Sequence, residues 1–541
     1  MPNMSAGSSA GLPPTDSAGT FFGHPKGLFV LFFAEMWERF SYYGMRALLI
    51  FYLVKHWAFS DSEGSVIYGA YTALVYITPV VGGYLADRYL GQRKAVTYGA
   101  ILLTLGHFLM AFEGDGALGQ ANPMMPIFWL ALALIIVGTG FLKANISVIV
   151  GQLYTRTDIR RDPAYTIFYI GINLGAALGS LLCGYIGETY SWAYGFGLAG
   201  FGMLAGLLVF IRGKPLLLGR GEAKDPARLK EKVAGLNLEW WMYLAGLGMV
   251  ALCWLAIQNQ SLVGYMLGGF GGALVLYVIF IAVAKLPAHD RDRIFAALFL
   301  ILTSIIFWAL FEQAGSSLNL FTDRHVDRGG VPASVFQSIN AIYIILLGPV
   351  FAILWTWLGR HRREPSTPLK FGMGVVQVGL GFLVLVWGAE WVGVDVPTPV
   401  IFIFLVYLFH TTGELCLSPV GLSAMNRLAP VHMASLIMGT WFFASATGNF
   451  AAGLIASATG GEGLEGAEAG KTVVLDVYQT VGVFAMGVGV AVMIVSPLIK
   501  KLMHLDTLTD DDVDHSLAGQ QELAEPQAAG MDPRPEQKPR A

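Results

Sequence analysis

Long apolar segments recur along this chain and constrain its fold more than any other feature. A helix needs about 20 apolar residues to cross the ~30 Å core of a bilayer, and about fourteen stretches here reach that length. Only 13% of the residues are charged, whereas soluble domains carry about 25%. Backbone groups must be satisfied inside lipid, and no stretch shows strand alternation, so we expect helices. The sequence predicts an all-α polytopic membrane protein with spans at 27–55, 64–87, 95–112, 126–152, 163–187, 192–212, 239–258, 264–285, 291–321, 332–358, 370–390, 398–426, 433–458 and 475–503.

The predicted spans group as six, two and six. Two six-helix bundles with a site between them are the plan of the major facilitator fold, and the central pair is expected to be a structural insertion lying to one side. The expected parts are an N-terminal tail (1–26), a six-helix bundle (27–212), a linker with two inserted helices (213–288), a second six-helix bundle (289–503) and a polar tail (504–541).

Basic residues predict the orientation. They gather in the loops at 91–94, 156–162, 212–232, 289–293 and 359–364, which all lie on one side of the predicted membrane. Cytoplasmic loops carry such an excess of Lys and Arg, so both termini are expected in the cytoplasm. The first 20 residues lack a basic start followed by an apolar core, so we expect no cleaved signal peptide.

The first apolar span carries ionisable residues that a bilayer disfavours. A charge at the bilayer centre costs from ~2.5 kcal/mol on insertion scales to above ~10 kcal/mol in simulations, so such a charge normally marks an ion or substrate path. Glu35, Glu38, Arg39, Tyr42 and Arg46 are spaced to share one helix face. Arg39 can pair with Glu35 one turn away, which leaves a second carboxylate weakly compensated and suited to reversible protonation.

Three further charges lie in other spans, and their depths predict two ion pairs. At 1.5 Å per residue, Arg46 lies about 28 Å and Glu312 about 33 Å from the cytoplasmic ends of their spans. Lys143 and Glu414 lie about 26 Å and 24 Å from the outer ends. We therefore expect Arg46–Glu312 on the outer side of a central site and Lys143–Glu414 on the inner side, and hypothesise that the two pairs alternate as gates. A proton arriving at Glu312 would release Arg46.

The loop GGYLADRYLGQRK at 82–94 resembles a motif of the major facilitator superfamily. Asp87 ends one predicted helix, and Arg88, Arg93 and Lys94 follow across a tight turn. Charges placed at helix ends interact with the helix dipoles. We expect a latch that locks two helices and breaks when the halves move; the alternative is an ordinary basic loop.

Two motifs identify a narrower resemblance. Residues 35–44 match E-x-x-E-R-F-x-Y-Y-G, the first-helix motif of the proton-dependent oligopeptide transporters. A second motif of that family is matched at Phe168, Tyr169, Ile172, Asn173 and Gly175. The chain departs from this motif at 176–177, where two alanines stand in place of the usual Ser-Leu. The segments at 307–321 and 413–430 also resemble that family's seventh and tenth helices. The inserted pair is similar to that of its bacterial members.

The resemblance implies a function and roles for individual residues. It implies proton-coupled import of di- and tripeptides across a bacterial plasma membrane by a protein expected to be monomeric, with protons as coupling ion, no other cofactor, no metal and no nucleic acid. Arg46 with Lys143 would bind the peptide carboxylate, and Glu414 with Asn340 the amine. Further contacts to the peptide are implied for Tyr42, Tyr43, Tyr71 and Asn173, and Trp308 and Trp441 would form apolar walls. Proton coupling would involve Glu35, Glu38, Arg39 and Glu312.

Other functions stay open at this point. Plant relatives carry nitrate and other anions, so an arginine and a lysine could serve a simple anion. A membrane enzyme or a non-transporting receptor is a more distant alternative, because the sequence offers no nucleophile–base pair and no large soluble domain. Gly69 stands where animal members carry a histidine, so coupling would rest on carboxylates. His410, although within a span, is expected to serve helix packing.

Overall fold

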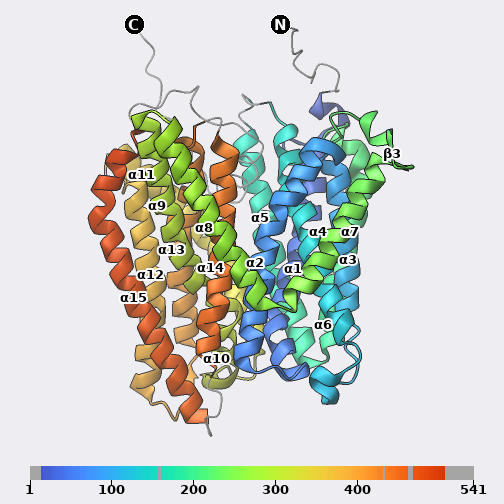
Figure 1. Ribbon diagram of the computed structural model, residues 1–541. Coiled ribbons are helices and arrows are strands. Elements are labelled where there is room, and N and C mark those ends of the chain that lie inside the picture. The colour runs from blue at the N-terminus through green and yellow to red at the C-terminus, as the bar shows by residue number, and fades with distance from the viewer. Residues whose placement is uncertain (1–13, 156–157, 159, 431–432, 461–466, 506–541) are drawn as a thin grey trace.

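The computed structural model describes residues 14–155, 158, 160–430, 433–460 and 467–505, and shows long helices packed side by side (Figure 1). α1 begins and α15 ends at the same end of the molecule, which we call the terminal end; the opposite end is the distal end. The first half contains α1 (Lys26–Phe51), α2 (Asp61–Leu85), α3 (Gln92–Met110), α4 (Met125–Gln152), α5 (Arg161–Thr189) and α6 (Trp192–Gly213). The second half contains α9 (Ala288–Phe311), α10 (Ser317–His325), α11 (Ser338–Arg360), α12 (Thr367–Val392), α13 (Ile401–Leu428), α14 (Ala434–Ala458) and α15 (Ala467–Leu502).

The lengths and composition of these helices fit a membrane protein. Among the described residues, 11 helices are long and apolar enough to cross a bilayer, and α9 with α10 counts there as one span, Ala288–His325. The other three predicted spans correspond to α1, α3 and α14. α1 contains four charged side chains in its middle, at Glu35, Glu38, Arg39 and Arg46, yet all four are buried. The predicted fold class, two helical bundles with an inserted pair, is confirmed.

Each half has its own apolar core, one around α1 to α6 and one around α9 to α15. The halves contact each other chiefly where α2 crosses α14 and α5 crosses α11. Glycine allows the first crossing, because a Cβ on Gly69 would lie 2.7 Å from Cα of Gly453. Gly69 is therefore a close backbone contact between the halves.

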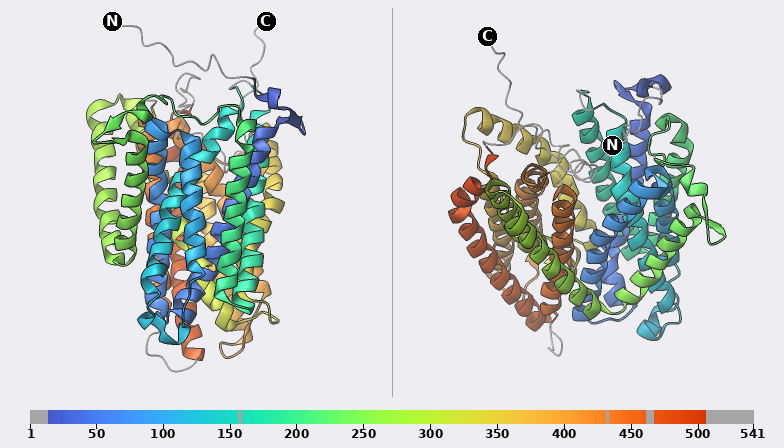
Figure 2. Two further views of the ribbon diagram at one scale, coloured as in Figure 1. Left: turned by 90° about the vertical axis from the view of Figure 1, so that its right-hand side faces the viewer. Right: turned by 45° about the horizontal axis from the view of Figure 1, so that its top comes forward.

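The inserted helices are α7 (Leu238–Ile257) and α8 (Gln260–Lys285). They lie to one side of the two bundles, as expected, and are coloured green in Figure 2. α7 packs on α4 and α2 of the first half, whereas α8 packs mainly on α14 and α9 of the second. The pair thus contacts both halves from the outside.

One predicted span is broken. The stretch 291–321 was expected to be a single helix, but α9 ends at Phe311, a 3₁₀ turn η7 follows (Glu312–Gly315), and α10 then begins. Ser316 adopts a non-helical φ of −125° and ψ of −100°. Gly315 lies against Tyr68 of α2, whose oxygen would be 1.9 Å from an added Cβ. The break therefore places Glu312 at a helix end that faces the first half.

The remaining elements are short. Three two-stranded ladders pair β1 (Thr20–Phe21) with β2 (His24–Pro25), β3 (Lys232–Val233) with β4 (Leu236–Asn237), and β5 (Val326–Asp327) with β6 (Thr398–Pro399). Two π-helical turns, η2 (Tyr52–His56) and η3 (Ala86–Leu90), extend α1 and α2. The 3₁₀ turns are η1 (Thr15–Ala18), η4 (Gly116–Ala121), η5 (Lys214–Leu217), η6 (Arg228–Lys230) and η8 (Ala333–Gln337).

The predicted N-terminal tail is partly structured. Residues 14–25 form η1 and the β1–β2 hairpin, which Arg160 at the start of α5 holds by donating to Asp16 and to the Gly23 carbonyl. Arg160 also donates to Asp158, and this bond lowers the pKa of the Asp158 carboxyl. The predicted C-terminal tail lies outside the described residues beyond 505.

Candidate functional site

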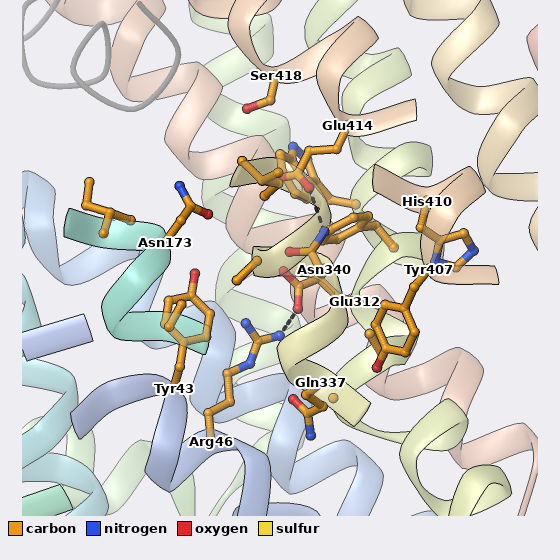
Figure 3. Close-up of a pocket in the computed structure, with 18 of the residues that line it drawn as sticks. Tyr43, Arg46, Asn173, Glu312, Gln337, Asn340, Tyr407, His410, Glu414 and Ser418 are labelled. Atoms are coloured by element: carbon orange, nitrogen blue, oxygen red, sulfur yellow. Dashed lines mark hydrogen bonds and ion pairs between the residues drawn. The ribbon is translucent and has the colours of Figure 1, made fainter. Parts of the chain in front are cut away.

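A cavity lies between the two halves, and side chains from both line it (Figure 3). The first half contributes Tyr43, Arg46, Tyr76, Lys143, Tyr169, Ile172, Asn173, Ala176 and Ser180. The second contributes Trp308, Phe311, Glu312, Ala314, Gly315, Gln337, Asn340, Ala341, Ile344, Tyr407, His410, Glu414, Leu415, Ser418, Pro419, Trp441 and Ser445. The structure thus brings together eight of the ten predicted substrate-binding residues, and Glu312 with them.

Arg46 and Glu312 form a buried ion pair across the cavity, as their depths predict (Figure 3). Arg46 also donates through Nε to the Tyr68 hydroxyl at 2.6 Å. The ring centroids of Tyr43 and Tyr68 lie 5.9 Å and 5.8 Å from its Cζ. A buried charge that loses its partner is strongly destabilised, so Arg46 requires an anion at this place. Sequence reasoning missed Tyr68, although its spacing of three from Tyr71 was a signal that it lies on the same helix face.

A second group of charges lines the cavity at Glu414 and Lys143. Asn340 of α11 donates to the Glu414 carboxylate at 3.0 Å and to the Thr411 hydroxyl at 3.0 Å. The Lys143 ammonium lies 4.8 Å from the ring centroid of Tyr76. The predicted neighbours Asn340 and Glu414 therefore touch, and the cavity has two cations from the first half and two carboxylates from the second.

The acidic and basic stripe of α1 lies apart from the cavity lining. Arg39 Nε is 2.8 Å from an oxygen of Glu35 and 2.8 Å from one of Glu38, and all three residues are buried. The predicted Glu35–Arg39 pair is thus present. Glu35 precedes Arg46 by eleven residues, or about 16 Å along the helix. The stripe is part of the interior of the first half, at a distance from the Arg46–Glu312 pair.

Two predicted substrate contacts do not line the cavity. Tyr42 and Tyr71 are both buried in the core of the first half. Consecutive residues on a helix point about 100° apart, and on α1 the next residue, Tyr43, is the one that faces the cavity. In this structure Tyr42 instead lies beside Arg39, whose Cζ is 5.9 Å from its ring centroid.

The residues of the predicted latch bond within the turn, to the linker and to α7. Asp87 accepts a hydrogen bond from Gln92 at 2.6 Å. Arg93 pairs with Glu222 of the linker, and Lys94 lies 2.7 Å from Glu239 of α7. The remaining basic residue, Arg88, lies over the rings of Tyr84 and Tyr89. Arg93 and Lys94 therefore contact the linker and the inserted helix, because the linker folds back over the turn between α2 and α3.

Aromatic side chains line the second-half wall of the cavity. Trp308 packs edge-on against Phe311 with centroids 5.4 Å apart, and Trp441 of α14 is buried beside Phe371. His410 lies at the edge of the cavity lining, but only 1% of it is exposed and its ring centroid lies 4.9 Å from that of Phe382. This agrees with its expected packing role. Lining residues that sequence reasoning did not assign to the site include Tyr76, Tyr169, Gln337, Tyr407 and Ser418.

Comparisons with known proteins agree on one family. A model of the POT family matches residues 93–462. A peptide transporter of Yersinia enterocolitica is 37% identical over 476 residues, covering 82% of this chain and 89% of that protein. A di-/tripeptide transporter of Lactococcus lactis is 33% identical over 452 residues, covering 79% and 88%. A crystal structure of the peptide transporter POT in complex with sulfate is similar with a TM-score of 0.77 and 35% identity, covering 91% of this chain and 98% of that one.

Proposed function

Because the chain belongs to the POT family, we propose that it imports di- and tripeptides together with protons by alternating access. The observation that carries this proposal is the separation of charge in the cavity. Arg46 and Lys143 come from the first half, and Glu312 and Glu414 from the second. Every short peptide has one carboxylate and one amine, so a peptide lying across the cavity satisfies both halves at once.

Peptide recognition depends in this proposal on groups that every peptide shares. Arg46 binds the carboxylate with Lys143 nearby, and Glu414 binds the amine with Asn340 holding its carboxylate in place. Asn173 and Tyr43 contact the peptide backbone, and Trp308 and Trp441 accept side chains. Charge-assisted hydrogen bonds are about twice as strong as neutral ones, so the terminal charges dominate binding. Broad tolerance of side chains and exclusion of tetrapeptides follow from the fixed separation of the charges.

Proton coupling arises because two anions compete for Arg46. The guanidinium is paired with Glu312 in this structure, and it cannot remain buried without an anion. A proton that neutralises Glu312 frees Arg46 for the peptide carboxylate. The stripe of Glu35, Glu38 and Arg39 supplies further carboxylates for proton movement. Lys143 and Glu414 act as the second gate, and the turn around Asp87, Arg88 and Arg93 follows the movement of the halves.

The proposed setting is the plasma membrane of a bacterium, with the protein acting as a monomer. The terminal end faces the cytoplasm, because the basic loops lie at that end. The distal end then faces the outside, from which protons and peptides enter.

Transport of a simple anion such as nitrate is less well supported. Glu414 also lines the cavity, and a second carboxylate would repel an anion that Arg46 and Lys143 attract. A zwitterion, in contrast, uses both kinds of charge.

The proposal is tested with purified protein in liposomes and labelled dialanine. We expect accumulation against a concentration gradient when the outside is acidic, and equilibration only when the proton gradient is abolished. Unlabelled dipeptides and tripeptides should compete, whereas tetra-alanine should not. Absence of dialanine uptake by folded protein, together with uptake of nitrate, would replace this proposal by the anion alternative.

A further inference from the structure

Two hydrogen bonds from the second half converge on one backbone oxygen of the first half. Asn319 Nδ2 of α10 and Gln337 Nε2 of η8 both donate to the carbonyl oxygen of Ala47 at 3.3 Å. Asn319 is buried, and Gln337 lines the cavity (Figure 3). Ala47 directly follows Arg46 in α1. The second half thus holds the first beside the Arg46–Glu312 pair by bonds that carry no charge.

The segments that carry these two amides are fixed by further contacts at the distal end. α10 contacts α1, and Glu188 at the end of α5 accepts a 2.7 Å bond from the backbone N–H of Ser334 at the start of η8. Lys55 lies 2.7 Å from Asp323, and Asp61 pairs with Arg324. These outer ion pairs are solvent-accessible, with Lys55 39% exposed and Arg324 40%. Exposed pairs of this kind contribute little and are screened by salt.

The neutral bonds and the central ion pair respond differently to a proton. The Arg46–Glu312 pair disappears when Glu312 is neutralised, whereas an amide–carbonyl bond is insensitive to that charge. On the proposed function, the pair separates when proton and peptide are both bound, and the distal end must stay closed at that moment or the peptide returns outside. We infer that Asn319 and Gln337 are positioning residues that keep the distal end closed while the Arg46–Glu312 pair is broken. The moment at which the ion pair breaks is taken from the proposed function, whereas the two hydrogen bonds to the Ala47 carbonyl are observed independently of it.

The test measures closure of the distal end directly, without a transport assay. Ser180 of α5 lines the cavity, so Ser180→Cys reports whether a membrane-impermeant maleimide added outside intact cells reaches it. The parent carries Ser180→Cys with Glu312→Gln, which removes the ion pair. The test variant adds Asn319→Leu and Gln337→Met, which keep the side-chain size and remove the donors. A neutral hydrogen bond of about 1 kcal/mol corresponds to a factor of about five in an equilibrium. We therefore expect labelling about 25-fold faster than in the parent, and about fivefold faster for each single substitution.

A matched control removes two amides that bond within one half. Asn145 donates to the Phe141 carbonyl at 2.8 Å, and Gln377 to the Met373 carbonyl at 3.3 Å. Asn145→Leu with Gln377→Met in the same parent should label at the parent rate. The same chain with Ser180 intact measures labelling of the three native cysteines, which are buried. With Glu312 restored, the variant that lacks the two donors should label more slowly than the same variant with Glu312→Gln, because the ion pair again holds the halves.

Two results would overturn the inference. One is labelling of the Asn319→Leu, Gln337→Met variant at the parent rate; the other is an equal rise in the control variant, which would indicate general loosening. Unchanged labelling from the cytoplasmic side in inverted vesicles establishes that the variants are folded. If folded protein takes up no peptide but the labelling follows the expected order, the proposed function is wrong while the role of Asn319 and Gln337 in closure stands.

Discussion

The two walls of the cavity differ in charge and in the side chains around the charges. The wall from the first half is basic and phenolic, with Arg46 and Lys143 beside tyrosines. The wall from the second half is acidic and more apolar, with Glu312 and Glu414 beside tryptophans and Phe311. Because neither wall, as the described residues line it, offers both charges, a zwitterion must touch both walls to be satisfied. The division of charge between the halves therefore links substrate recognition to their relative movement.

The largest effect on transport is expected from removing Arg46, the cation of the first-half wall that lies nearer the distal end. Arg46→Gln leaves Glu312 buried without its partner and removes the site for the peptide carboxylate. Losing one member of a buried pair costs about 3–5 kcal/mol, so dialanine uptake should fall more than about 100-fold. Arg212→Gln, at an exposed arginine near the end of α6, is the control and should transport normally. Near-normal uptake by Arg46→Gln would show that the walls do not divide the charges as described.

Replacing the acid that faces Arg46 should separate coupling from binding. In Glu312→Gln the side chain can no longer release a proton, so a proton gradient should not drive accumulation. Exchange of labelled for unlabelled dialanine should continue, since Arg46 remains available to the peptide. Measuring both processes in the same liposomes distinguishes them. Full gradient-driven accumulation by this variant would assign coupling to another group.

The second acid should affect affinity for the amine. Glu414→Gln loses a charged partner for the peptide N-terminus, and hydrogen bonds to charged groups contribute about 1.5–3 kcal/mol. The concentration for half-maximal dialanine uptake should therefore rise about 10- to 150-fold, with the maximal rate less affected. Glu390→Gln, at an exposed position on α12, serves as the control. An equal loss of dialanine affinity in both variants would show that removing any carboxylate weakens binding, and that Glu414 has no specific role.

The smallest effects should come from the uncharged groups, and they should differ between the walls. Trp441→Phe enlarges the apolar part of the cavity, so competition by phenylalanine-containing dipeptides should change relative to dialanine by a factor of about ten, the lower end of the effect of a small change in an apolar pocket. Tyr169→Phe on the opposite wall keeps the ring and should leave that ratio unchanged. A larger change of this ratio in Tyr169→Phe than in Trp441→Phe would assign side-chain selectivity to the first-half wall instead.

Much of this arrangement follows from sequence, because intramembrane charges leave few choices. The helical periodicity of α1 and the depths of Arg46 and Glu312 predict the stripe and the central ion pair, and the structure contains both. The break after Phe311 was not predicted, because it depends on Gly315 meeting Tyr68 of a distant helix. The same limit applies to Tyr42, since residue spacing fixes a helix face only approximately and tertiary packing decides whether Tyr42 or Tyr43 reaches the cavity. The partners of Arg93 likewise depend on how the linker folds back.

The central claim is that opposite walls of the cavity bind the two terminal charges of the peptide. Its most direct test combines a change in the peptide with a change in the protein. Competition against labelled dialanine is measured with dialanine, N-acetyl-dialanine and dialanine amide, in the unaltered protein and in Glu414→Gln. In the unaltered protein both modified peptides should compete at least about tenfold less well than dialanine, since each lacks one charged contact. In Glu414→Gln the difference between dialanine and its N-acetyl form should largely vanish, while the penalty for the amide remains. An unchanged penalty for N-acetylation in Glu414→Gln would contradict the account, because the amine would then be recognised elsewhere.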